Sequence, residues 1–155
     1  ADVYFNKGVL YGDNNRHDEA IASYSRCLEV NPKHVEAFYN RGNIYASQGM
    51  YQKAIDDYTA IIAVDGEYLD AYYSRGGAYG RLKQYEKALD DYEFVLTKFK
   101  SFYAAYFMKG VVLEKLGRTE EARDTFELFL QKTPDIDIYA DRIAAAKEIL
   151  ADLKK

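Results

Sequence analysis

The chain has 155 residues, of which 48% are hydrophobic and 30% are charged, as in one globular domain or a short array of repeats. Its 21 Lys and Arg residues against 25 Asp and Glu give a net charge of -4, which disfavours a protein that binds nucleic acid through the phosphate backbone. Cys27 is the only cysteine, so an internal disulfide is impossible, and no uncharged run approaches the roughly 20 apolar residues of a membrane-spanning helix.

Small and aromatic residues recur along the chain at a constant spacing of 34. Glycine and alanine form two series: Gly8, Gly42, Gly76 and Gly110; and Ala20, Ala54, Ala88 and Ala122. Aromatic side chains form two more: Tyr4, Phe38, Tyr72 and Tyr106; and Tyr24, Tyr58, Tyr92 and Phe126. Several independent series with one period predict four stacked copies of one supersecondary unit.

Each unit is expected to be a pair of helices joined by a short turn. The four units cover 1–34, 35–68, 69–102 and 103–136. In the first unit, the breakers of residues 13–15 separate two helical segments. In the second, Phe38, Gly42 and Tyr45 lie at i, i+4 and i+7, which places them on one face of a helix. The glycines then let the two helices approach, and the alanines make room for a facing aromatic ring.

The last segment, 137–155, is expected to be one amphipathic helix. Its apolar face would consist of Tyr139, Ile143, Ala146, Leu150 and Leu153. A stack of hairpins leaves its last apolar face uncovered, so a helix with a charged outer side is suited to be a terminal cap.

These series resemble the tetratricopeptide repeat family over nearly the whole chain. The resemblance implies an all-α fold, a right-handed superhelical α-solenoid of four helix-turn-helix hairpins plus a capping helix, in one domain covering 1–155. Pro32 and Pro134 keep the family's proline, whereas Gly66 and Lys100 replace it in the middle units, which leaves the turn geometry there open. The family's usual leucine before each glycine is a cation in every unit.

The same resemblance implies a concave groove lined by the first helix of each unit. Taking 100° per residue, the side opposite the core face gives the candidate groove residues. They are Phe5, Asn6, Glu36, Tyr39, Asn40, Asn43, Asp70, Tyr73, Ser74 and Phe107.

Aromatic residues stand at one groove position in all four units, although the repeat pattern does not require them there. Such rings offer rigid contact area to a peptide or helix. They could equally pack on the neighbouring repeat, and both interpretations stay open. The acidic row of Asp2, Glu36 and Asp70 favours a ligand that carries Lys or Arg, unless these carboxylates are simply solvated.

Related domains that hold the carboxylate terminus of chaperones use a clamp of Lys, Arg and Asn. By alignment, those positions here carry Phe5, Val9, Asn40, Asp70 and Ser74. Only the asparagine matches, and Asp70 would repel a carboxylate. A chaperone clamp is therefore disfavoured.

The cations before the glycines predict ion pairs inside the middle hairpins. An aspartate stands sixteen residues after each arginine, so Arg41 is expected to pair with Asp57 and Arg75 with Asp91, on facing helices. His17 and His34 have no second ligand at metal-binding spacing and are expected at the surface, whereas Cys27 is expected to be buried.

The best-supported function is a protein-protein interaction scaffold that binds a partner peptide or helix in the groove through basic or apolar anchors. The alternative is a homo-oligomerising module that associates through the terminal helix or the side of Phe94 and Leu128. No enzyme motif, cofactor, metal box, nucleic-acid site or membrane-inserting segment is expected. The sequence leaves the compartment open between cytoplasm and export, and a start inside the leading turn suggests a piece of a longer array.

Overall fold

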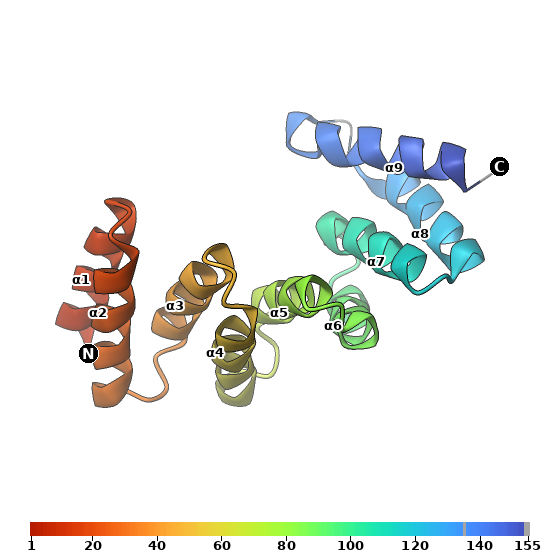
Figure 1. Cartoon of the computed structure of the whole chain (residues 1–155). Coiled ribbons are helices and arrows are strands. Elements are labelled where there is room, and N and C mark those ends of the chain that lie inside the picture. The colour runs from red at the N-terminus through yellow and green to blue at the C-terminus, as the bar shows by residue number, and fades with distance from the viewer. Residues whose placement is uncertain (135, 154–155) are drawn as a thin grey trace. The chain divides into compact units, whose positions relative to one another are not determined.

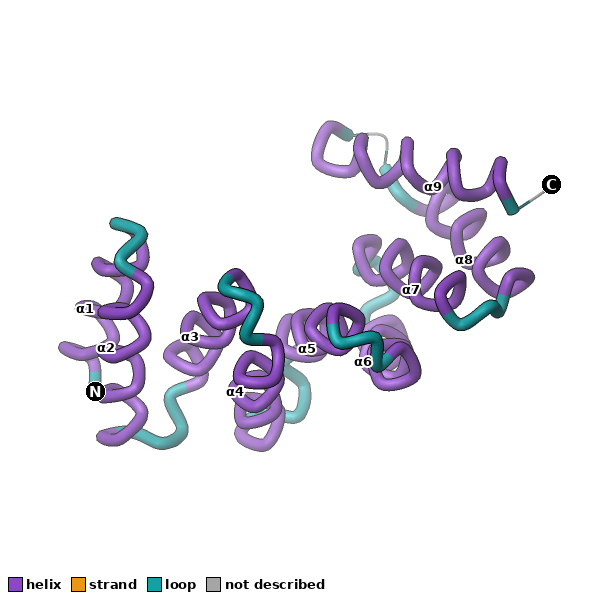
Figure 2. The backbone as a smooth tube through the Cα atoms, viewed as in Figure 1, coloured by secondary structure: helices purple, strands orange, loops and turns teal. Residues whose placement is uncertain are grey.

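The computed structural model describes residues 1–134 and 136–153, and all of the regular secondary structure in these residues is helical (Figure 1). The elements in chain order are α1 (Asp2–Asp13), α2 (His17–Val30), α3 (Val35–Ser47), α4 (Tyr51–Val64), α5 (Leu69–Arg81), α6 (Tyr85–Lys98), α7 (Tyr103–Lys115), α8 (Thr119–Lys132), the 3-10 helix η1 (Asp137–Tyr139) and α9 (Ala140–Asp152). Short loops join them (Figure 2). The chain divides into two compact units, Ala1–Leu82 with α1–α5 and Lys83–Lys155 with α6–α9, and each is described by itself.

Helices that follow one another in the chain pack on one another. In the first unit α1 packs on α2, α2 on α3, α3 on α4, and α4 on α5. In the second unit α6 packs on α7, α7 on α8, and α8 on α9. The predicted all-α solenoid of helical hairpins is confirmed.

The turn inside each hairpin uses one residue with a positive φ. These residues are Asn15 (φ 57°), Gly49 (76°), Lys83 (59°) and Gly117 (72°), again 34 apart. Glycine adopts this conformation freely, asparagine tolerates it, and lysine does so at a steric cost. A search of the sequence for helix-breaking residues therefore misses the third turn, at Lys83, although its backbone has a positive φ like the other three turns.

The turns that follow the first three hairpins keep one geometry with or without proline. The residue that ends each second helix is extended, with φ between -138° and -130°, at Asn31, Asp65 and Phe99. Its carbonyl oxygen accepts a hydrogen bond from the N–H three residues later, at 3.1–3.3 Å. The next position holds Pro32, Gly66 and Lys100 in turn. Proline is thus compatible with this turn but not required by it.

The core of each described hairpin is a contact between a glycine and an aromatic ring. A Cβ atom added to Gly8 would lie 2.5 Å from Cε1 of Tyr24, and one on Gly110 would lie 2.7 Å from Cε1 of Phe126. Gly42 meets Tyr58 in the same way, at 2.9 Å. The expectation that the glycines allow close approach of the helices is confirmed, and the alanines of the second series are fully buried.

The predicted ion pair of the second hairpin is present and bidentate. Nε of Arg41 donates to Oδ2 of Asp57 at 2.9 Å, and Nη2 donates to Oδ1 at 2.7 Å. Burial raises the pKa of the Asp57 carboxyl, against the opposing effect of the Arg41 hydrogen bonds and charge. Nη1 of Arg41 also donates to Oγ of Ser25 on α2 at 2.8 Å, so this side chain joins three helices.

The contact between the cation before the glycine and the preceding hairpin recurs in the third and fourth repeats. Arg75 donates to Oγ1 of Thr59 at 3.2 Å, and Nζ of Lys109 lies 2.8 Å from Oε1 of Glu93. The sequence analysis considered only partners within a hairpin and missed this link between hairpins. The predicted Arg75–Asp91 pair involves residues of different units and stays a prediction.

The capping segment is shorter than predicted. Residues 137–139 form η1, in which the N–H of Tyr139 bonds to the carbonyl of Ile136, and α9 then runs over 140–152. The expected single helix over 137–155 is therefore wrong at its start, and its last two residues lie outside the described range, as does residue 135 of the predicted fourth unit. Ala146 and Leu150 are buried, as the amphipathic pattern predicts.

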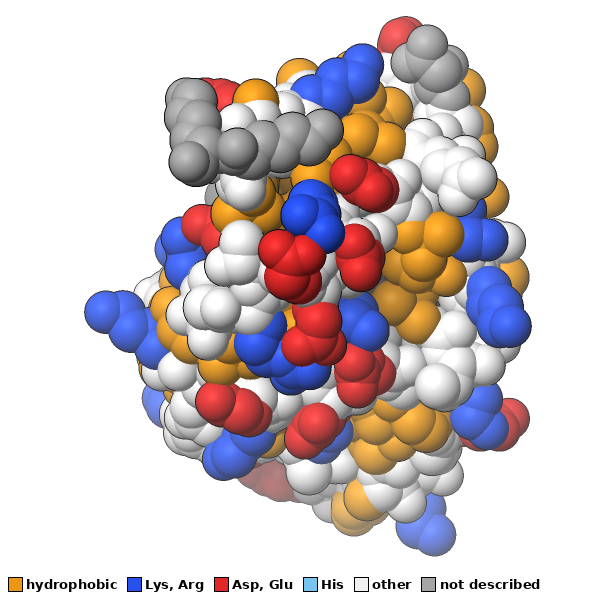
Figure 3. All heavy atoms as spheres, turned by 90° about the vertical axis from the view of Figure 1, so that its right-hand side faces the viewer, with side chains coloured by type: hydrophobic (Ala, Val, Ile, Leu, Met, Phe, Trp, Pro, Cys, Tyr) orange, Lys and Arg blue, Asp and Glu red, His pale blue; other side chains and the backbone are white. Residues whose placement is uncertain are grey.

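Charged side chains of both signs are interspersed with apolar ones on the face shown in Figure 3. Exposed ion pairs include Arg16 with Glu19 and Arg118 with Glu121, each between the residue that precedes a helix and its first turn. Pairs of this kind contribute little to stability. Within residues 1–134 and 136–153, no helix has the length and apolar character needed to cross a bilayer.

The glycine–ring contact predicts opposite effects of alanine at two helical glycines. Gly110→Ala should destabilise the protein by about 1–3 kcal/mol, because its Cβ would overlap the fully buried Phe126 ring. Gly80→Ala, which has no atom within 4 Å, should stabilise by about 0.5–1 kcal/mol through helix propensity. Urea unfolding of both variants measures the difference, and equal shifts would contradict the packing argument.

The buried ion pair predicts a non-additive double mutant. Asp57→Ala should cost about 3–5 kcal/mol, because Arg41 would keep its charge at a site where its side chain is only 17% exposed. The double variant Arg41→Met and Asp57→Leu should lose much less, since no unpaired charge remains. Denaturant unfolding of the single and double variants tests this, and a double variant as unstable as the single one would refute it.

Candidate functional site

All predicted groove residues lie on first helices of the hairpins. Those of α1, α3 and α5 belong to the first unit, whereas Phe107 belongs to α7 in the second. The site is therefore described for the first unit, and the place of Phe107 in the same row stays a prediction.

The aromatic row is half-buried in the described residues. The Phe5 ring stacks on His34 with centroids 4.8 Å apart and tilts against Tyr24 at 5.9 Å. Tyr39 makes the equivalent contacts, with Tyr58 at 6.1 Å and Tyr68 at 5.8 Å. The rings thus pack on their own second helix and on the residue before the next hairpin, and each packs against a core cluster that includes an alanine of the next first helix, Ala37 or Ala71.

Phe107 repeats part of this arrangement in the second unit, where its centroid lies 5.9 Å from Phe126 and 5.6 Å from Phe129. Phe5, Tyr39, Tyr73 and Phe107 all remain partly accessible. Packing and ligand contact are therefore compatible roles for these rings.

One polar groove residue bonds to a buried tyrosine hydroxyl. The Tyr58 hydroxyl donates to Oδ1 of Asn43 at 2.7 Å, which holds this carboxamide in place on α3. Burial raises the pKa of the Tyr58 and Tyr24 phenols, so both stay neutral. Asn40 lines the same pocket as the Tyr24 ring. The separation of fifteen between Asn43 and Tyr58 was the available sequence signal.

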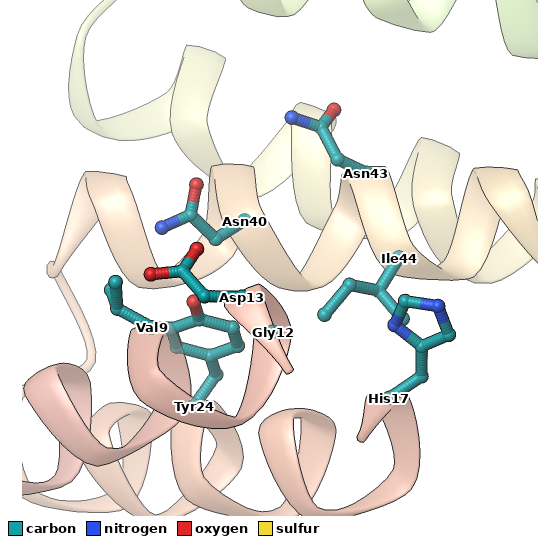
Figure 4. A pocket seen from close by; sticks show the side chains of 8 residues that line it. All are labelled: Val9, Gly12, Asp13, His17, Tyr24, Asn40, Asn43 and Ile44. Atoms are coloured by element: carbon teal, nitrogen blue, oxygen red, sulfur yellow. The ribbon is translucent and has the colours of Figure 1, made fainter. Parts of the chain in front are cut away.

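A pocket of about 240 Å³ lies among α1, α2 and α3 (Figure 4). Asn40 and Asn43 of the predicted set line it. Val9, Gly12 and Asp13 come from α1, His17 and Tyr24 from α2, and Ile44 from α3. Val9, Gly12, Asp13 and Tyr24 were not among the predicted groove residues, and Tyr24 was predicted only as an aromatic of the repeat.

Both histidines depart from the predicted surface position. His17 lines the pocket, and its Nδ1 is buried without a hydrogen-bond partner in the described part of the chain. The His34 side chain is 13% exposed, and its Nδ1 accepts a hydrogen bond from the N–H of Ala37 at the start of α3. Two residues with no metal-binding spacing were thus wrongly treated as solvated. No group of three His, Cys, Asp or Glu side chains suited to a metal ion occurs within the described ranges.

The remaining predicted residues are solvent-facing. Asn6, Glu36 and Asp70 are exposed, and Oε2 of Glu36 lies 3.1 Å from Nδ1 of His34. Cys27 is fully buried, as predicted, and burial raises the pKa of its thiol. A buried thiol with a raised pKa is a poor nucleophile.

Two family models, both described as tetratricopeptide repeat, match the chain, one at residues 1–34 and 35–68 and the other at 73–135. A search of curated protein sequences gave no match. Among solved structures, the MamA protein is 22% identical with a TM-score of 0.84, over 99% of this chain and 85% of that one.

The descriptions of two further similar structures mention a peptide or a peptide-binding site. YrrB, described as a TPR protein with an unusual peptide-binding site, is 26% identical with a TM-score of 0.79, over 97% of this chain and 76% of its own. The second TPR domain of human RPAP3, solved with the HSP70 peptide SGPTIEEVD, is 30% identical with a TM-score of 0.66, over 76% of this chain and 92% of its own. With family models that match most of its length and hairpins built on the glycine–ring contact, this chain belongs to the tetratricopeptide repeat family.

Proposed function

We propose that the protein is an interaction scaffold that binds a partner peptide or helix along the side of α1, α3 and α5. The observation that carries this proposal is the pocket among α1, α2 and α3, beside partly accessible rings and a tyrosine-anchored carboxamide. The family membership and the peptide-binding relatives support it. The protein would act by holding its ligand rather than by catalysis.

The packing of the aromatic rings on this surface favours tight binding of a peptide ligand. Phe5 and Tyr39 are held by contacts behind them, so a ligand that covers their free sides orders few additional rotamers. Rigid aromatic rings of this kind are common binding hot spots. The groove residues Asn6, Glu36, Asn40, Asn43, Asp70, Tyr73 and Ser74 of the first unit would complete the contact surface.

Selection from a random peptide library tests the proposal. Each enriched peptide is measured on the wild type and on the double variant Tyr39→Ala and Tyr73→Ala. We expect at least about a tenfold loss of affinity, since truncating a hot spot costs about 2 kcal/mol or more and about 1.4 kcal/mol corresponds to a factor of ten.

Because Tyr39 also packs on Tyr58, a second variant uses an exposed groove position. Asp70→Arg should weaken the same peptides without a change in thermal unfolding, whereas the exposed Asp56→Arg on α4 should not. Circular dichroism first shows that all variants are folded. Peptides that bind every variant equally would place the site elsewhere.

The chaperone peptide SGPTIEEVD should not bind. Phe5 and Val9 supply no cation for its terminal carboxylate, and Asp70 would repel it. Fluorescence anisotropy with the labelled peptide measures this, and the human RPAP3 domain is the positive control. Binding of comparable strength to both proteins would contradict the assignment of the groove positions.

Self-association is a second candidate, favoured by an apolar surface on the second unit. Phe99 is 52% exposed, as is Ile136, and Ile138 is 74% exposed. They lie near the T-shaped contact of Tyr103 with Tyr139 in the chain. If this surface associates, light scattering should give a mass above the monomer that Ile138→Asp reduces, whereas a monomeric mass at high concentration would rule it out.

A further inference from the structure

The pocket among α1, α2 and α3 has an uneven chemistry that indicates what it binds. Figure 4 shows the Asp13 carboxylate near the Tyr24 hydroxyl and Asn40 at one end, and His17 with Ile44 toward the other. Val9, Ile44 and the Tyr24 ring supply apolar walls between these polar groups. Such a lining suits a side chain with an apolar stem and a polar head.

The size of the pocket limits its occupant. Sites for whole small molecules are about 300–1,000 Å³, and this pocket is smaller, at about 240 Å³. One long side chain of a bound peptide is therefore a better fit than a separate ligand.

Asp13 gives the pocket its charge. Of the lining side chains it is the only carboxylate, and neither Lys nor Arg lines the pocket. Its carboxylate makes no ion pair or hydrogen bond within the described residues, and the rest of this side of the first unit adds Glu36 and Asp70 but no exposed cation among the groove positions.

The position of Asp13 in its helix shows that its carboxylate does not serve the fold. It is the last residue of α1, where the helix dipole disfavours an anion. The equivalent positions of the other hairpins, 34 residues apart, hold Ser47, Arg81 and Lys115. Two of these are cations, as a helix C-terminus prefers.

A second observation indicates a ligand at the other end of the pocket. Nδ1 of His17 is buried and has no hydrogen-bond partner in the described chain, although buried polar groups are nearly always bonded. Because Nδ1 has almost no accessible surface in this orientation, a polar group of the ligand would complete its hydrogen bonding once the imidazole ring turns toward the pocket.

We propose that this pocket binds a lysine or arginine side chain of the partner peptide, with the cation at Asp13 and Asn40 and the stem against Val9, Ile44 and Tyr24. This inference rests on the proposed function and adds the class of anchor residue. A charge-assisted hydrogen bond to Asp13 would supply specificity as well as affinity.

The test uses phage-displayed random dodecapeptides selected on the wild-type chain. We expect one position of the selected peptides to be enriched in Arg or Lys. For each, citrulline replaces the arginine, or norleucine the lysine, and dissociation constants are measured by fluorescence anisotropy. Citrulline keeps the length of the arginine side chain and norleucine keeps the four-carbon stem of lysine, and both remove the charge.

The variant Asp13→Asn should weaken the selected peptides by at least about tenfold and leave the neutral peptides unaffected. Asp18→Asn is the matched control, because it removes the same charge from an exposed residue of α2 outside the pocket. It should change affinity less than about twofold, as expected for a screened surface charge. Asp13→Asn should not lower the thermal stability, whereas Asp18→Asn should lower it slightly, because Asp18 lies in the first turn of α2.

The possible outcomes distinguish the proposal for the pocket from the proposal for the groove. Equal losses in Asp13→Asn and Asp18→Asn, or selected peptides without a basic position, would overturn the proposal for the pocket. If the peptides that overturn the proposal for the pocket still bind the double variant Tyr39→Ala and Tyr73→Ala less tightly than the wild type, the proposed function stands without the pocket. If no peptide depends on either set of residues, both proposals fail.

Discussion

The close contact between a glycine on the first helix and an aromatic ring on the second determines how each described hairpin packs. Without a Cβ at Gly8, Gly42 and Gly110, the rings of Tyr24, Tyr58 and Phe126 lie directly against the helix backbone. This approach buries large rings within a unit of only two helices, which could not otherwise enclose a core. The position of every other residue on the first helix follows from which face meets the ring.

Polar side chains then connect one hairpin to the next. Arg41 reaches back to Ser25 and forward to Asp57, so a single guanidinium links α2, α3 and α4. On the same helix, Asn43 accepts a hydrogen bond from the Tyr58 hydroxyl. Tyr58 thus has two functions, because its ring fills the core and its hydroxyl orients a side chain of the candidate groove. Phe126 lacks the hydroxyl, and the fourth unit has no such link.

The candidate site consists of groups that the repeat does not need. Asp13 opposes the helix dipole, and Nδ1 of His17 is buried without a partner in the described chain. A fold that otherwise satisfies its local preferences departs from them where a function requires it. That these departures share one pocket is the reason to connect them with ligand binding.

Residue spacing predicts the helical hairpins, their period, the close approach of the helices at the glycines and the Arg41–Asp57 pair, because each depends on residues at fixed separations within one repeating unit. It also places the candidate residues on the first helices. The packing of the helices, in contrast, determines that a ring of the second helix lies against the glycine in the first, second and fourth repeats, that Lys83 adopts a glycine-like turn, and that the cap begins with η1. It also brought His17 and Ile44 to the same pocket as Asp13. Helical periodicity assigns a residue to a face, but which residues of three helices surround one cavity depends on how those helices pack.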